Sequence, residues 1–185
     1  MRRLAAAAAL AFALLAPMAS VSADSLGPTG SYFDLDKTGF CDAGTPCLAV
    51  RVTVELIDKV ASACVVVSTS DGLGGDVLET GCLESGVAVI FTDKFITGIA
   101  PTAFTVDDGA GNTRSVTISA TSTATGAPTK HVGTIDLPPV GGCVTTQYYR
   151  YLNVVLSGTV TIGSTGIPSD GRSFNLNNRE KTRCA

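Results

Sequence analysis

The stretch Leu48-Ala-Val-Arg-Val-Thr-Val-Glu-Leu-Ile57 decides the fold class of this chain. Leucine or valine stands at every even position, while alanine, arginine, threonine and glutamate occupy the odd positions from 49 to 55. Successive side chains of a strand point to opposite faces of a sheet, so this period of two is typical of a half-buried antiparallel strand. The stretch therefore predicts a strand whose leucine and valine side chains lie in a hydrophobic core.

Similar segments follow along the chain, separated by turns rich in glycine, aspartate, serine and proline. No segment shows the apolar spacing of a helix. We expect further strands over 61–68, 77–83, 87–91, 104–106, 116–120, 131–137, 147–162 and 173–176. This pattern predicts an all-β fold, an antiparallel β-sandwich of immunoglobulin-like kind with about eight to ten strands.

Four local features refine this expectation. Val87–Phe91 is wholly apolar, which is typical of a central strand. Residues 121–129 are rich in Thr, Ser, Ala, Gly and Pro and predict a loop. Gly158 interrupts the longest alternating segment and indicates a bulge. Ser173–Leu176 is short and follows a turn, so we expect it to add an edge strand.

The first 23 residues have the composition of a secretory signal peptide. Arg2 and Arg3 form a positive segment, Leu4–Ala16 is apolar, and Val21-Ser22-Ala23 offers small residues for cleavage before Asp24. We therefore expect residues 24–185 to form a single secreted domain. The sequence has no Asn-x-Ser/Thr glycosylation site, which favours a bacterial secreted protein.

The charge balance argues against nucleic acid as a partner. The chain has 13 Lys and Arg against 16 Asp and Glu, and removal of Arg2 and Arg3 leaves 11 against 16, a net charge of −5. The basic cluster Arg179, Lys181 and Arg183 predicts a solvated C-terminal tail. No apolar run after the signal is long enough to span a membrane.

All six cysteines follow the signal, so they meet an oxidising compartment and predict structural disulfides. Many pairings are formally open. Closeness along the chain favours three of them, namely Cys41 with Cys47, Cys64 with Cys82, and Cys143 with Cys184. Each long-range bridge stabilises a fold by about 2–4 kcal/mol.

Residues that carry catalysis are scarce. His131 is the one histidine of the chain, and no Gly-x-Ser-x-Gly nucleophile motif occurs. A secreted hydrolase with an unrecognised active site that uses Asp107, Asp108 or His131 remains the alternative. We expect no organic cofactor.

Calcium is the one cofactor for which the sequence offers ligands. Asp34, Asp36 and Asp42 fall at a spacing that suits calcium, although Thr45 stands where an EF-hand has a glutamate. Aspartates beside glycines, as in the turns at 70–76 and 107–112, are more typical of turn formation.

Tyr149 and Tyr151 are the best candidates for a binding surface. On a strand they point the same way, opposite to Leu152 and Val154, and exposed tyrosines stack on sugars or anchor protein interfaces. The sequence thus favours a non-enzymatic extracellular module that binds a protein or a glycan. A purely structural role in the cell envelope remains open.

Overall fold

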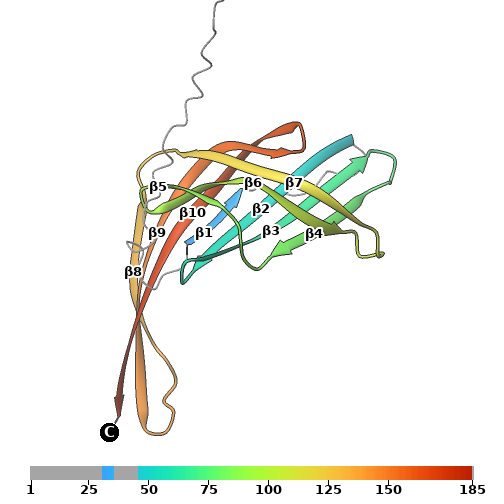
Figure 1. Cartoon of the computed structure of the whole chain (residues 1–185). Helices are drawn as coiled ribbons and strands as arrows, with labels where there is room; N and C mark the ends of the chain where they lie inside the picture. Colours follow the sequence, from blue (N-terminus) through green and yellow to red (C-terminus); the bar gives the residue numbers. More distant parts are fainter. Residues whose placement is uncertain (1–30, 36–45, 185) are drawn as a thin grey trace, which may run out of the picture.

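A computed structural model of the chain describes residues 31–35 and 46–184, and these residues form ten strands and no helix (Figure 1). The segment 1–23, predicted as a signal peptide, and the residues Asp36, Cys41 and Asp42 lie outside the described residues. Within the described ranges there is no helix of the length and apolarity that crossing a bilayer requires. The strands are β1 (Ser31–Leu35), β2 (Pro46–Ile57), β3 (Val60–Asp71), β4 (Val77–Leu83), β5 (Val89–Thr92), β6 (Phe95–Asp107), β7 (Thr113–Ala124), β8 (Thr129–Asp136), β9 (Cys143–Ile162) and β10 (Thr165–Cys184).

All ten strands belong to one antiparallel sheet with the order β10-β1-β2-β3-β4-β6-β7-β9-β8. β9 also pairs with β10, so the row from β10 to β9 closes on itself, while β5 pairs with β6 off this path. The predicted all-β antiparallel fold is confirmed. The finer expectation, a sandwich of immunoglobulin-like kind, is not confirmed, because hydrogen-bonded pairing links every strand into a single sheet.

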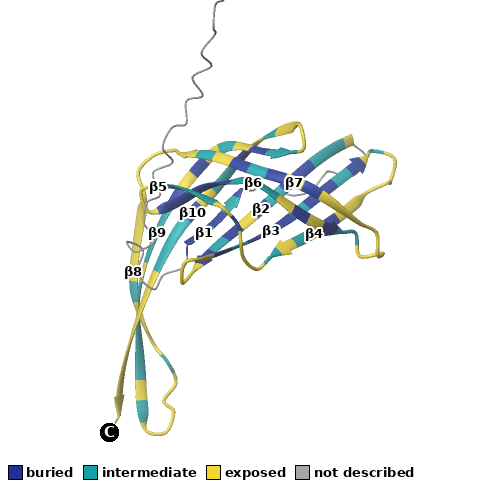
Figure 2. Cartoon of the chain, in the orientation of Figure 1, coloured by how far each residue is buried: buried dark blue, intermediate teal, exposed yellow. Residues whose placement is uncertain are grey.

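The hydrophobic core lies inside the closed part of the sheet (Figure 2). On β2 the predicted inward face is confirmed, since Val50, Val52, Val54 and Leu56 are all buried, and Leu48 packs against the same cluster. Phe33 and Phe104 are the largest of the fully buried side chains. Burial of this apolar surface is the main force that holds the closed sheet together.

Glycines mark the seams where neighbouring strands approach most closely. A Cβ atom on Gly171 of β10 would overlap the carbonyl oxygen of Asp34 on β1, and one on Gly158 of β9 would overlap that of Thr121 on β7. The same holds for Gly81 against β6 and for Gly98 against β7. Glycine within a strand often marks a place where another backbone comes close. The register runs through Gly158 without a shift, so the predicted bulge is wrong and close approach explains this glycine instead.

Three further expectations differ from the structure. The predicted central strand at Val87–Phe91 is not central: β5 pairs with β6 alone, along residues 95–99, whereas β4 meets β6 at its other end, at Asp107. The expected loop at 121–129 begins later, since β7 runs to Ala124 in pairing with β9. The short edge strand at 173–176 is part of the 20-residue β10, which pairs with β1 on one side and β9 on the other.

β9 and β10 extend beyond the closed body and carry β8 with them (Figure 1). We call this three-stranded extension the arm, made of β8 with residues 143–151 of β9 and 176–184 of β10. Both faces of the arm are exposed or half-buried along its length (Figure 2). Arg179, Lys181 and Arg183 are solvent-exposed as predicted, but they belong to a strand paired with β9 and not to a tail.

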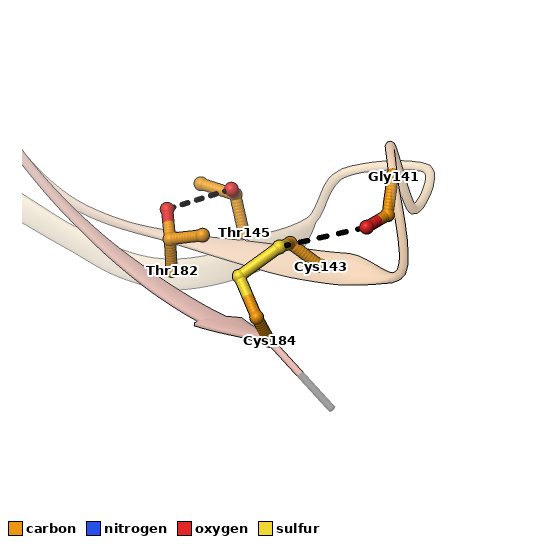
Figure 3. Close-up of a disulfide and its surroundings, with 5 residues drawn as sticks. All are labelled: Gly141, Cys143, Thr145, Thr182 and Cys184. Atoms are coloured by element: carbon orange, nitrogen blue, oxygen red, sulfur yellow. Dashed lines mark hydrogen bonds between the residues drawn. A yellow bond between two sulfur atoms is a disulfide. The ribbon is translucent and has the colours of Figure 1, made fainter.

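Two disulfides join residues that lie directly opposite each other on paired strands. Cys64 on β3 bonds Cys82 on β4, with their Cα atoms 4.1 Å apart. Cys143 bonds Cys184 at the tip of the arm, where the Cα atoms are 3.9 Å apart and the hydroxyls of Thr145 and Thr182 hydrogen-bond beside them (Figure 3). Both are pairings that proximity along the chain favours. The third pair, Cys41 with Cys47, stays a prediction because Cys41 lies outside the described residues.

The glycine seams predict a specific cost of adding one methyl group. Gly171→Ala should lower the free energy of unfolding by about 1–3 kcal/mol, because β10 and β1 must separate to admit the Cβ atom. Gly166→Ala on the same strand is the matched control, since its Cβ would sit 3.4 Å from the Thr159 Cγ2 atom, an ordinary contact. Denaturant unfolding followed by circular dichroism measures both. Equal stability of the two variants would contradict the close approach.

Candidate functional site

A row of aromatic side chains crosses four strands on the outer face of the sheet. Tyr32 on β1 lies directly opposite Phe174 on β10, with ring centroids 4.9 Å apart. Phe174 also contacts Tyr151 on β9 at 5.2 Å, and Tyr151 contacts His131 on β8 at 5.7 Å. These separations are typical of favourable aromatic pairs. We call these four residues the aromatic row.

Tyr149 lies on the same outer face, two residues from Tyr151 along β9. A Cβ atom on Gly133 of β8 would overlap the Tyr149 hydroxyl, so the phenol lies across the backbone of β8. The predicted orientation of the two tyrosines, away from Val154, is thus what the structure shows. The sequence pattern did not indicate Tyr32 or Phe174 beside them, because 173–176 was expected as a separate edge strand, and because Tyr32 reaches Phe174 only through the pairing of β1 with β10.

Charged side chains on β1 and β2 lie next to the Tyr32 end of the aromatic row. The Tyr32 hydroxyl hydrogen-bonds the carboxylate of Glu55, and this bond, with burial, raises the pKa of the Tyr32 phenol above its ordinary value of 10.0. Arg51 donates from Nε to Oδ1 of Asp34 at 3.2 Å and from Nη2 to Oδ2 at 2.6 Å. This pair is about one-third exposed, so its net contribution to stability is small.

A shallow hollow adjoins the aromatic row where β9, β10 and β1 run side by side. Two carboxylates, one guanidinium group and two apolar side chains line it, from the residues Asp34, Val155, Asp170, Gly171, Arg172 and Phe174. Gly171 has no side chain there, and Phe174 brings one edge of the aromatic row to the rim. The outer face thus offers flat apolar rings next to groups that donate and accept hydrogen bonds.

The residues proposed for calcium are not brought together in the described part of the chain. Asp34 lies on β1, where both carboxylate oxygens accept hydrogen bonds from Arg51. Asp36 and Asp42 lie outside the described residues. In residues 31–35 and 46–184 there is no group of three or more His, Cys, Asp or Glu side chains that could hold a metal ion.

The turn aspartates use their carboxylates on their own backbones. Asp71 Oδ1 accepts from the N–H groups of Leu73 at 2.7 Å and Gly75 at 2.9 Å, and these bonds hold the pKa of Asp71 below its ordinary value of 3.8. The side-chain amide of Asn112, at 2.7 Å, lowers the pKa of Asp108 in the same way. These contacts support the interpretation that aspartates beside glycines form turns here.

The residues of the hydrolase alternative lie apart. His131 is on β8 at one side of the molecule, whereas Asp107 ends β6 and Asp108 begins the turn to β7 at the other side (Figure 1). A histidine must lie within hydrogen-bond reach of the carboxylate that orients it. These three residues therefore cannot act as one catalytic unit.

The most buried carboxylate outside the turns, Glu79, is held by Arg114. Arg114 donates from Nε and Nη2 to the two carboxylate oxygens at 2.6 and 2.5 Å, and the Glu79 side chain is only 10% exposed. This pairing holds the pKa of Glu79 below its ordinary value of 4.5. The pair joins β4 to β7 across β6, where the register of β4 with β6 is a single pair, Thr80 with Asp107. The ion pair therefore stabilises the junction of β4 and β6, where backbone pairing is sparse.

The chain matches no family model, no curated protein and no solved structure. The assignment of a site therefore rests on the geometry of the residues themselves.

The ion pair between Glu79 and Arg114 predicts a contribution to the free energy of unfolding that depends on pH. Arg114→Ala leaves the nearly buried Glu79 carboxylate without its cation, so the free energy of unfolding near neutral pH should fall by about 1–3 kcal/mol. Because the folded pKa of Glu79 is lowered, the contribution of the pair is complete above the unfolded pKa and is lost as the pH falls through the folded pKa. The difference between variant and wild type should therefore shrink on acidification below the ordinary pKa of 4.5.

Denaturant unfolding at neutral pH and in acid measures this difference. Lys94→Ala, which removes an exposed cation, is the control and should change stability little. If the difference in the free energy of unfolding between Arg114→Ala and the wild type persists in acid, Arg114 acts through packing instead of charge.

Proposed function

We propose that this chain is a secreted, non-enzymatic binding module that takes an extracellular protein or glycan on the outer face of its sheet. The aromatic row is the observation that supports this proposal best. Its rings come from four strands, and three of them are half-buried while His131 is exposed. Large aromatic side chains outside a core are the usual anchors of binding surfaces.

The chemistry beside the aromatic row suits both kinds of ligand. Flat rings stack on the apolar face of a sugar or on apolar side chains of a protein. The neighbouring hollow adds the carboxylate of Asp170 and the exposed guanidinium of Arg172, which can hydrogen-bond hydroxyl or amide groups. The paired strands hold all these groups in fixed positions, which lowers the entropy that a ligand must overcome on binding.

The aromatic row also stabilises the sheet, since cross-strand pairs contribute about 0.2–1 kcal/mol each. Binding and folding must therefore be separated in any test. Tyr149 serves this purpose, because it lies beside the row and rests on the backbone of Gly133. The hydrolase alternative, which named Asp107, Asp108 or His131, stays a prediction.

The outer-face proposal predicts that Tyr148 and Tyr149, which are neighbours on β9 but point to opposite faces, differ in their effect on ligand affinity. Arrays of oligosaccharides and of extracellular proteins identify a ligand, and calorimetry gives its affinity. Tyr149→Ala and Tyr151→Ala should each weaken that affinity about tenfold or more, as truncation of an aromatic anchor does. Tyr148→Ala is the matched control, because Tyr148 points to the other face and its loss should leave the affinity unchanged.

Gly133→Ala adds a test that removes no aromatic group, since the new methyl pushes the Tyr149 phenol from its place. Circular dichroism establishes that each variant is folded. The chain has no tryptophan and four tyrosines, three of them on the outer face, so a ligand there should also change the tyrosine fluorescence. Unchanged affinity in all three outer-face variants would show that the ligand binds elsewhere.

A further inference from the structure

All lysine and arginine side chains of the arm lie on one face, opposite to the aromatic row. Arg150 on β9 has the same parity as Val154 and Leu156, which point into the core farther along that strand. On the N-terminal side of Leu152, β9 leaves the body (Figure 2), and the positions of this parity are exposed at Val144, Tyr148 and Arg150. We call this surface the basic face, and its cations are Lys130, Arg150, Arg179, Lys181 and Arg183.

Strand alternation separates the charges on β10. Arg179, Lys181 and Arg183 stand at every second position and point to the basic face, while Glu180 between them points to the other face. There Glu180 accepts a hydrogen bond from Nε2 of Gln147 at 2.6 Å. The acidic residue that interrupts the cluster in the sequence therefore does not neutralise it in the fold. Asp136 is the one carboxylate on the basic face, and it accepts a hydrogen bond from Thr146 at 2.7 Å.

The five cations are exposed, and none forms an ion pair with another residue of the described chain. Like charges held together without counter-charges repel, which favours an external anion as their partner. A hollow lined by Tyr148, Arg179 and Lys181 lies on this face. The remainder of the secreted chain is acidic, so the arm is a basic extension of an acidic body.

The arrangement of the cations is linear. In the register of the strands they run diagonally from Lys130 on β8 through Arg150 on β9 to Arg179 on β10, and then along β10 to Arg183. Neighbouring cations on β10 are about 7 Å apart, and the whole track is about 27 Å long, from the rise per residue of a strand. Such a track matches an extended polymer with regularly repeated charges.

We propose that the basic face binds a linear anionic polysaccharide that carries sulfate or phosphate groups. Guanidinium groups form paired hydrogen bonds with such oxyanions, and three of the five cations are arginines. This site is separate from the outer face, so a module with both sites can hold a neutral ligand and a charged polymer at once.

Dextran sulfate is the probe, and uncharged dextran of the same length is its matched control. Binding of the full secreted chain is measured by calorimetry at several salt concentrations. Dextran sulfate should bind and dextran should not, and the affinity should fall as salt is raised, because bound counterions are released. Arg179→Gln with Lys181→Gln should weaken binding about tenfold or more and make the salt dependence shallower.

Lys59→Gln with Lys94→Gln is the control variant, because it removes two cations from the body and changes the net charge equally. It should keep most of the affinity. An equal loss in both double variants would overturn the proposal, since binding would then follow net charge alone. Binding of dextran as tight as that of dextran sulfate would overturn it as well.

Two other occupants are outcomes of the same experiment. Tighter binding of single-stranded DNA of matched charge would replace the polysaccharide with a nucleic acid. Self-association of the chain without any polymer, abolished by the change at Arg179 and Lys181, would assign the face to the acidic body of a second copy. Neither result would affect the outer-face proposal, whose test uses Tyr149 and Tyr151.

Discussion

The closure of the sheet depends on how near two backbones can come. At Gly158 and Gly171 the carbonyl oxygen of the neighbouring strand occupies the space of a Cβ atom. These glycines let β9 and β10 pair with β7 and β1 while they also pair with each other. Once that pairing exists, the inward positions of the strands in the closed body converge on one core, and the outward positions form one continuous surface. The pairing of β10 with β1 also brings Tyr32 to the aromatic row.

The sequence predicted the elements better than their arrangement. The alternation at Leu48–Ile57 gave the correct inward face of β2, and closeness along the chain led to the correct partner for Cys64. Both are local features, which a short stretch of sequence contains. Tyr32 and Phe174 lie far apart in the sequence, and no local pattern links the strands that carry them, so their contact could not be predicted. The same limit explains why a closed single sheet was not distinguished from a sandwich.

The C-terminal half of β10 is the part of the arm that the sequence pattern did not predict as a strand. This polar half has no core to face, so the alternation of apolar and polar residues that marks a strand is absent after Leu176. The strand forms there because β9 supplies a hydrogen-bonding partner along its full length. The alternation that does persist is one of charge, in which cations occupy every second position. Charge patterning of this kind becomes informative only when the strand is known.

The disulfide at the tip of the arm has a consequence for surface chemistry. A slip of one residue between β9 and β10 would exchange the two sides of β10, which would place its cations among the tyrosines and Glu180 among the remaining cations. The glycine seams fix the register in the body, but the arm has no core to do so. Cys143 and Cys184 fix it at the far end. This covalent bond therefore keeps two chemically distinct surfaces of a thin three-stranded ribbon from mixing.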